Sequence, residues 1–185
     1  MEENSCAFTG HRPAKFGWGY DEGHPDCVKL KLLLESQIVK LCELGVTTFI
    51  TGMAQGVDQW AALSVLKLRQ TLPTIRLVCA LPCEGQTKSW TDVAKVQYEN
   101  IVGQADAVHY VSRAYTKDCM IERNHWMVDH AGFVLAVYDG SYRGGTAATV
   151  RYAQKNDRRM IRIHPVSFAV THHPDEWYKQ LDNHS

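Results

Sequence analysis

The sequence predicts an α/β protein with a Rossmann-like, doubly wound architecture, in which a mostly parallel sheet carries helices on both faces. Short apolar runs, each closed by Gly, Pro or Asp, alternate along the chain with longer segments of helical periodicity. The run Phe133 to Tyr138 (FVLAVY) is apolar throughout, which is typical of a central strand covered on both faces. Parallel strands need crossover connections, and the intervening helical segments supply them.

The first half of the chain is expected to form three strands and two helices. Cys6 to Phe8 is a brief strand candidate, which ends where Gly10 and Pro13 turn the chain. A helix is expected from about Pro25 to Leu44, because leucines recur at three- and four-residue steps and Gly45 follows as a C-cap. A β-branched strand, a helix and a strand are expected next, at residues 47–51, 57–72 and 75–81.

The second half continues the alternation. Thr91 is a plausible N-cap for a helix that runs to about Gln104. Before the apolar strand at 133–138, we expect a short strand at 107–111 and a helix at 120–130. After it, we expect a helix at 146–156 and a last strand at 160–164. Pro174 and Asp175 can open a short C-terminal helix over about 174–183.

Length and composition limit the number of domains and the classes of partner that we expect. Residues 1–185 are expected to form one domain, because one ordinary core suffices at this length. The chain has 20 basic and 20 acidic side chains, and this zero net charge argues against binding nucleic acid mainly through phosphates. We expect a cytoplasmic protein without a membrane partner, because the N-terminus is polar and no apolar run is long enough to span a bilayer.

Six cysteines are scattered through the sequence, and we expect them to be free thiols in buried or half-buried positions. Only Cys79 and Cys83 lie close together, and their spacing is neither a CxxC redox pair nor half of a zinc ribbon. We therefore expect no structural metal and no required cofactor.

Segments that follow strands are the candidate site, because ligands of open α/β sheets bind at the carboxyl ends of the strands. The first such segment, Thr9-Gly10-His11-Arg12-Pro13, offers a hydroxyl, an imidazole and a guanidinium. Arg is a bidentate partner for phosphate or carboxylate, and His can donate a hydrogen bond or move a proton. The alternative is that Gly and Pro only shape a turn while His11 and Arg12 are solvated.

Two further loops are rich in glycine and open helices. Thr51 to Asp58 (TGMAQGVD) contains Gly52 and Gly56, and its backbone N–H groups can approach an anion at the following helix N-terminus. Asp58 is either a first-turn acid that complements the helix dipole or an acceptor for a ribose or base. The loop after the most apolar strand contains Asp139, Gly140, Gly144, Gly145 and Thr146. Its glycines can let the backbone contact a phosphate closely at the helix N-terminus. The alternative is that they only allow the chain to turn in a hairpin-like connection.

Two other segments complete the candidate site. In the loop after residues 75–81, Gln86 can read a base edge or ribose and Trp90 can form a stacking wall, unless this is a surface loop with a half-buried Trp. Arg123 lies on a helix, on one face with Met127 and His130, and can clamp a phosphate. The alternative for Arg123 is an ion pair with Asp129 or Glu122.

Taken together, these loops resemble the SLOG superfamily, which includes DNA-processing protein A and the lonely-guy phosphoribohydrolases, and more narrowly its YpsA-like branch of uncharacterised proteins. The motifs that carry the resemblance are TGHRP at 9–13, TGMAQGVDQWAA at 51–62, LPCEGQTKSW at 81–90, RNHWMVDHA at 123–131 and YDGSYRGGT at 138–146. The resemblance implies a nucleotide-binding domain whose ligand is of the ADP-ribose, NAD or nucleoside phosphate type. The matching pocket positions are Gly10, Arg12, Gly52, Gly56, Asp58, Arg123, Gly144, Gly145 and Thr146.

The resemblance does not transfer an enzyme activity. In the lonely-guy hydrolases, an Arg before the last central strand and a Glu soon after the GGxGT loop carry the chemistry. Arg123 sits suitably, but residues 147–149 are Ala, Ala and Thr, so the expected carboxylate is absent. N-glycosidic cleavage benefits from a carboxylate near the developing positive charge, and Asp58, Glu84 or Asp139 would have to substitute.

The leading hypothesis is a sensor or regulator that binds a small phosphorylated nucleotide. The alternative is an N-glycosidase acting on a nucleoside monophosphate, with Arg123, Asp58 and Glu84 as catalytic candidates. A weaker alternative is single-stranded DNA binding, against which the neutral composition argues. Whether exposed aromatic residues build a homodimer stays open.

Overall fold

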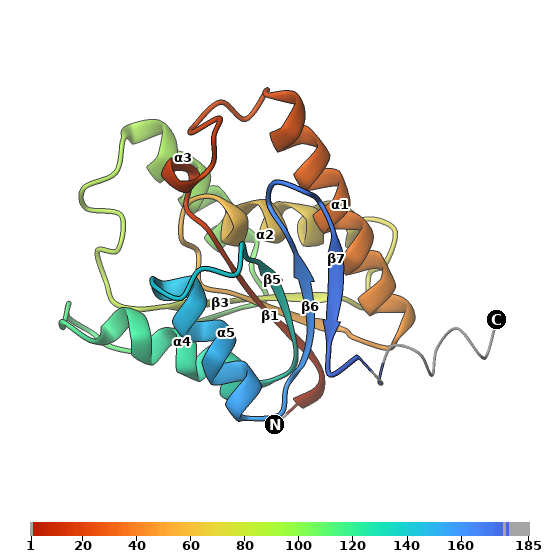
Figure 1. The fold of residues 1–185 in the computed structure, drawn as a ribbon. Helices are drawn as coiled ribbons and strands as arrows, with labels where there is room; N and C mark the ends of the chain where they lie inside the picture. Colours follow the sequence, from red (N-terminus) through yellow and green to blue (C-terminus); the bar gives the residue numbers. More distant parts are fainter. Residues whose placement is uncertain (1, 176, 178–185) are drawn as a thin grey trace.

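A seven-stranded sheet forms the centre of the computed structural model, which describes residues 2–175 and 177 (Figure 1). The strand order is β4-β3-β2-β1-β5-β6-β7, and neighbours are parallel except β6 and β7. This arrangement confirms the expected Rossmann-like α/β architecture. The strands are β1 (Glu2–Gly10), β2 (Thr48–Thr51), β3 (Arg76–Leu81), β4 (Ala107–Tyr110), β5 (Ala131–Val137), β6 (Arg159–Ile163) and β7 (Val170–His173).

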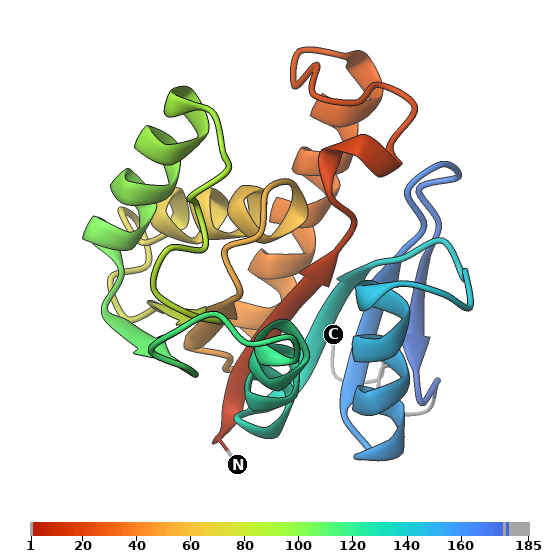
Figure 2. The same cartoon turned by 90° about the vertical axis from the view of Figure 1, so that its left-hand side faces the viewer.

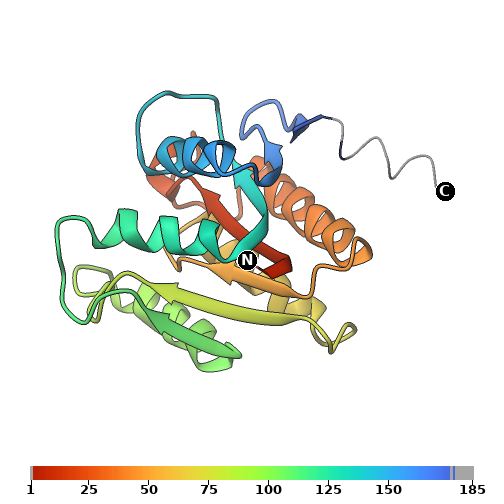
Figure 3. The same cartoon turned by 90° about the horizontal axis from the view of Figure 1, so that it is seen from below.

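Helices cover both faces of the sheet. Helices α1 (Pro25–Glu43), α2 (Val57–Leu68) and α3 (Asp92–Gln104) lie on one face, while α4 (Cys119–Asp129) and α5 (Gly145–Lys155) lie on the other (Figures 2 and 3). Alternation along the strands divides the apolar side chains between two cores. For example, Phe8 packs toward α1 and α2, whereas the neighbouring Ala7 packs toward α4 and α5.

Strand β1 occupies the position where the chain reverses direction across the sheet. From β1 the chain moves outward through β2 and β3 to β4, then returns to the other side of β1 as β5. The connections that leave β1 and β5 therefore diverge to opposite sides, and a crevice opens between their carboxyl ends. This topology brings the loop after residue 10 next to the loop after residue 137.

Most expected elements are confirmed to within a few residues, and Thr91 caps α3 by accepting a hydrogen bond from Ala94 N at 3.3 Å. The expectation of a three-residue first strand was wrong. Strand β1 runs from Glu2 to Gly10, because its polar beginning also pairs with β5. Strand β7 was not expected, and most of the proposed helix at 174–183 lies outside the described residues.

The irregular stretch from Phe16 to Asp26 is packed against the body of the protein. It follows a short 3-10 helix, η1 (Pro13–Lys15). Phe16 is buried, stacks on Trp18 at 4.7 Å between ring centroids, and contacts Trp60 of α2. The segment is therefore a fixed aromatic wall beside α2.

Two other expectations concern the whole chain. The six cysteines are free thiols, five of them buried and Cys42 half-buried. Among the described residues, no helix is both long and apolar enough to cross a membrane.

Candidate functional site

A cavity of about 510 Å³ lies at the carboxyl ends of β1 and β5, where the topology predicts a crevice. Its walls come from the loop after β1, the turn before α2, the loop between β5 and α5, and one face of α4. Segments that are more than 100 residues apart in sequence therefore meet around one space.

Two glycines bring the N-terminus of α2 against the loop after β1. A Cβ atom at Gly10 would lie 2.5 Å from the Val57 side chain, so a side chain at this position would push α2 away. Gly56, the N-cap of α2, has φ +92°, and its Cβ would lie 2.7 Å from the His11 carbonyl oxygen. Both positions require glycine for the N-terminus of α2 to pack against the loop after β1, where Val57 N donates to the His11 carbonyl at 3.5 Å.

Arg123 of α4 forms part of the cavity wall and is 4% exposed. Its guanidinium donates one hydrogen bond to the Gly52 carbonyl and another to Asn124 Oδ1 at 2.8 Å. Burial lowers the pKa of Arg123, while the nearby Asp58 carboxylate opposes that shift. An arginine keeps its charge even so, and its remaining N–H groups are available to an anion in the cavity.

Asp58, in the first turn of α2, is a buried carboxylate in the cavity wall. Its Oδ2 accepts a hydrogen bond from Ala54 N at 3.3 Å, and its own carbonyl accepts one from the Thr51 hydroxyl at 2.9 Å. Burial raises the pKa of Asp58, and the charge of Arg123 partly offsets that rise. The site thus holds a carboxylate whose charged form is disfavoured.

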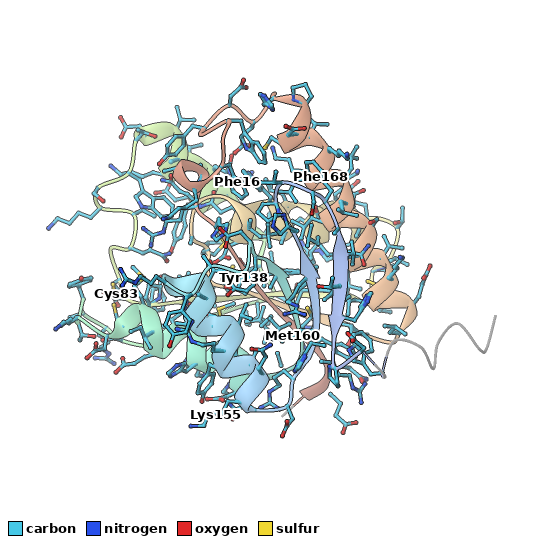
Figure 4. All side chains as sticks on the ribbon, viewed as in Figure 1. Phe16, Cys83, Tyr138, Lys155, Met160 and Phe168 are labelled. Atoms are coloured by element: carbon cyan, nitrogen blue, oxygen red, sulfur yellow. The ribbon has the colours of Figure 1, made fainter. Side chains whose placement is uncertain are left out.

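The loop between β5 and α5 is held in shape by hydrogen bonds around Asp139. Asp139 Oδ1 accepts from Ser141 N at 2.9 Å, and the Tyr138 hydroxyl donates to the Ser141 carbonyl at 2.6 Å. Tyr138 is labelled near the middle of the molecule in Figure 4. The Ser141 hydrogen bond lowers the pKa of Asp139, with a smaller contribution from His11, whose Nε2 lies 3.3 Å from Asp139 Oδ1.

Helix α5 presents its N-terminus to the same cavity. Gly144, its N-cap, has φ +105°, and Gly145 has open space where a side chain would start. Each helix N-terminus carries roughly half a positive charge, so α2 and α5 together supply about one. The charged lining adds four cations to two carboxylates: Arg12, Lys15, Arg123 and Arg143 against Asp58 and Asp139. The cavity is therefore locally cationic in a chain of zero net charge.

The structure brings most of the expected site residues into this cavity. Ten of them line it: Thr9, Gly10, His11, Arg12, Asp58, Arg123, Asp139, Gly144, Gly145 and Thr146. Gly52 lies behind Arg123 and makes room for its guanidinium. Gly56 lines the neighbouring cavity, described below.

Other expectations need correction. Glu84, Gln86 and Gly140 line neither cavity, and Glu84 is exposed. Gln86 instead donates to the Gly52 carbonyl at 3.2 Å, so it supports the backbone beneath Arg123. The ion pair weighed for Arg123 with Glu122 or Asp129 was wrong, because its guanidinium reaches the buried Gly52 carbonyl instead.

Sequence reasoning missed several lining residues. Arg143 and Ser141 stand within the glycine-rich loop, and Lys15 follows the first motif, so their positions carried a signal that was not used. Asn124 follows Arg123 directly and accepts a hydrogen bond from its guanidinium, but nothing in the sequence distinguishes it from its neighbours. Ala14, Ala54 and Met120 contribute small or apolar surface for which the sequence holds no distinctive signal.

Across residues 2–175 and 177, no group of three or more His, Cys, Asp or Glu side chains is placed to hold a metal ion. The polar lining of the cavity combines cationic donors with the carboxylate acceptors of Asp58 and Asp139.

Comparison with known proteins places this geometry in a family. The sequence profile of the YspA SLOG family matches residues 6–170, which include every motif that lines the cavity. The chain belongs to the YspA SLOG family. It is 29% identical to a UPF0398 protein of Halalkalibacterium halodurans, over 94% of this chain and 91% of that protein. It is 32% identical to the uncharacterised SPbeta prophage-derived protein YoqJ of Bacillus subtilis, over 77% of this chain and 91% of YoqJ.

Solved structures share the fold of this YspA SLOG family member. DNA processing protein A of Helicobacter pylori, whose structure was described for its single-stranded DNA binding mode, superposes with a TM-score of 0.59 at 18% identity. That match covers 97% of this chain and 72% of the other. The protein of Streptococcus pneumoniae superposes with a TM-score of 0.55 at 14% identity, over 88% of this chain. This chain spans about half of the S. pneumoniae protein, 51% of its length.

Proposed function

We propose that this protein binds a phosphorylated nucleotide or nucleotide-derived ligand in the cavity at the carboxyl ends of β1 and β5, and acts as a sensor or regulator through that ligand. The observation that carries the proposal is the convergence of the N-terminus of α5, the first turn of α2 and the buried Arg123 on one space. Backbone N–H groups at such termini and a guanidinium are the donors that phosphate oxygens require.

The lining also supports a ligand with more than phosphate. Asp58 and Asp139 are acceptors in a mainly cationic cavity, and they repel a bare anion. Their presence is explained if the ligand offers hydroxyl donors as well, as a ribose does. A ribose phosphate group satisfies both the cations and the carboxylates.

Gly145 gives the sharpest test of the phosphate site. A side chain at this position meets nothing within 4 Å, so Gly145→Asp folds normally and adds a negative charge at the first residue of α5. Gly103→Asp is the matched control, because this position is also open but lies at the far end of α3, outside both cavities.

The measurement is thermal unfolding of the full chain with inorganic phosphate, ribose 5-phosphate, adenosine 5′-monophosphate, ADP-ribose and NAD. We expect at least one nucleotide to raise the unfolding midpoint of the unmodified protein and of Gly103→Asp, because a ligand that binds only the folded state stabilises it. Gly145→Asp should lose this shift. No shift with any of these compounds at millimolar concentration refutes the proposal.

A second function, N-glycoside hydrolysis of a nucleoside monophosphate, is favoured by one observation. Asp58 is a buried carboxylate in the cavity wall, and its burial raises its pKa, as the environment of a general acid or base does. Release of free base from nucleoside monophosphates, measured by chromatography and lost in Asp58→Asn, would support it. Intact substrate after prolonged incubation with the unmodified protein leaves binding as the function.

A further inference from the structure

A second cavity, of about 580 Å³, adjoins the first. Arg12 lines both cavities. The turn before α2 and the first turn of that helix separate them, with Ala54 and Asp58 on one side and Gln55 and Gly56 on the other. The outer walls of the second cavity come from the segment before α1 and from the beginning of α3. Figure 2 shows these two parts standing on either side of α2.

The second cavity is close to neutral, in contrast to the first. Its charged lining consists of Arg12 and Glu22. Both Glu22 oxygens are already used inside the protein, since Oε1 accepts from Trp60 Nε1 at 2.9 Å and Oε2 from Lys31 Nζ at 2.6 Å. What remains for a ligand is a set of amides and hydroxyls, which suits a neutral group with hydrogen-bonding edges better than a second phosphate.

Two aromatic side chains, Trp90 and Tyr20, line this cavity from different segments. Trp90 is half-buried and is held by an edge contact with Tyr98, at 5.6 Å between ring centroids. The next residue, Thr91, caps α3, so the indole stands directly before a fixed helix start. Tyr20 is 68% exposed and comes from the segment before α1. Such rings offer flat faces on which a heterocycle can stack.

The side-chain amides of two glutamines complete the lining of the second cavity. Gln59 of α2 is buried, and its Nε2 donates to the Met53 carbonyl at 3.3 Å. Gln97 of α3 in turn donates its amide N–H to Gln59 Oε1 at 2.9 Å. This chain of bonds orients Gln97 so that its carbonyl oxygen is the acceptor left for a ligand in the cavity, such as the amino group of a base.

We propose that the second cavity is a nucleobase subsite. The base lies against Trp90, and the attached phosphate reaches past Arg12 into the first cavity. This inference rests on the proposed function, because it takes the first cavity as the phosphate site. Arg12 joins the two subsites, and an aromatic lining in which one cation is balanced by one carboxylate distinguishes the second cavity from the cationic first one.

The test compares adenosine 5′-monophosphate with ribose 5-phosphate, which lacks the base, by titration calorimetry on the full chain. The unmodified protein should bind the nucleotide on the order of tenfold more tightly, because its base stacks on an aromatic side chain and ribose 5-phosphate has no base to stack. Trp90→Ala should lose that advantage and bind ribose 5-phosphate as before, while Trp90→Phe should recover much of it. Tyr115→Ala, an exposed aromatic residue that lines neither cavity, is the control and should behave like the unmodified protein.

The outcomes separate this inference from the proposed function. If ribose 5-phosphate binds but the nucleotide binds no more tightly, or if Trp90→Ala keeps the full nucleotide affinity with a native unfolding curve, the base subsite is wrong and the phosphate site stands. If neither compound binds, the proposed function fails with it. Quenching of tryptophan fluorescence by the nucleotide, absent with ribose 5-phosphate and reduced in Trp90→Ala, gives an independent readout of stacking.

Discussion

The guanidinium of Arg123 occupies the place where a side chain at Gly52 would begin, and it donates a hydrogen bond to the Gly52 carbonyl. A Cβ built on Gly52 would lie 2.5 Å from Arg123 Cζ. Helix α4 and the turn after β2 lie 71 residues apart in the chain, yet they fix the position of the main buried cation together. The missing side chain at Gly52 therefore makes room for the guanidinium of the proposed anion site.

Gly52→Ala should displace Arg123 and weaken ligand binding. The added methyl group overlaps the guanidinium, and overpacking of this kind typically costs about 1–3 kcal/mol of folding stability. We expect a lower unfolding midpoint and a loss of at least about tenfold in nucleotide affinity, measured by denaturation and calorimetry. Unchanged affinity in Gly52→Ala would show that Arg123 does not hold the ligand.

Gly10→Ala should destabilise the fold, because its methyl group would lie 2.5 Å from the Val57 side chain and would force α2 away from β1. A cost of about 1–3 kcal/mol is expected in chemical denaturation. Gly145→Ala is the comparison, since open space surrounds that position and its unfolding free energy should change little. Equal stability of the two variants contradicts the close contact between α2 and β1.

Asp58→Asn should raise the unfolding midpoint at neutral pH. The folded state raises the pKa of Asp58, so it binds more protons than the unfolded chain between the two pKa values, and stability falls as the pH rises through that window. An amide avoids this penalty and can still accept the hydrogen bond from Ala54 N. Denaturation curves of both proteins from pH 4 to 8 should diverge with rising pH. If the stabilities of the two proteins change with pH in parallel, Asp58 does not cause this pH dependence.

The same Asp58→Asn variant separates two roles of the carboxylate in binding. Removing a negative charge from the cavity should tighten binding of inorganic phosphate. If Asp58 accepts a ribose hydroxyl, ribose 5-phosphate should gain less from the substitution than phosphate does. Calorimetric titration with both compounds measures the difference. An equal gain in affinity for both would show that Asp58 does not accept a hydrogen bond from the ribose.

Asp139→Asn should reduce stability at neutral pH and lose its effect in acid. The hydrogen bond from Ser141 N lowers the pKa of Asp139, so its contribution is complete above the unfolded pKa and disappears as the pH falls through the folded value. The effect should be small, because this side chain is 41% exposed. The difference in unfolding midpoint between the variant and the unmodified protein should be larger at pH 7 than at pH 3.

Much of the fold was predictable because its signals are local. The run FVLAVY at 133–138 marks β5, and Thr91 marks the start of α3, since each depends on side chains adjacent in sequence. Strand β7 was missed because Val170–His173 is too short to show a clear alternation and is fixed by antiparallel pairing with β6. Long-range pairing of this kind leaves little trace in a single sequence.

The candidate site, like the fold, was predictable from the sequence only where its signals are local. The glycine-rich loops and the arginines were recognisable, because only certain residue types make close contact with an anion. The partner of Arg123 was not recognisable, since a backbone carbonyl has no sequence signature and the charged neighbours Glu122 and Asp129 suggested an ion pair instead. Gln86 was assigned to the ligand for a similar reason, whereas its partner is the same carbonyl of Gly52.

The position of β1 at the centre of the sheet has a consequence for cooperativity. One wall of the cavity comes from the segment that leads through β2 to β4, and the other from β5 and α5, so both halves of the chain must be docked before the cavity exists. A partly folded chain with either half detached lacks this cavity. Binding of the proposed ligand should therefore be linked to global unfolding, and hydrogen exchange in both halves of the sheet should slow together when the cavity is filled.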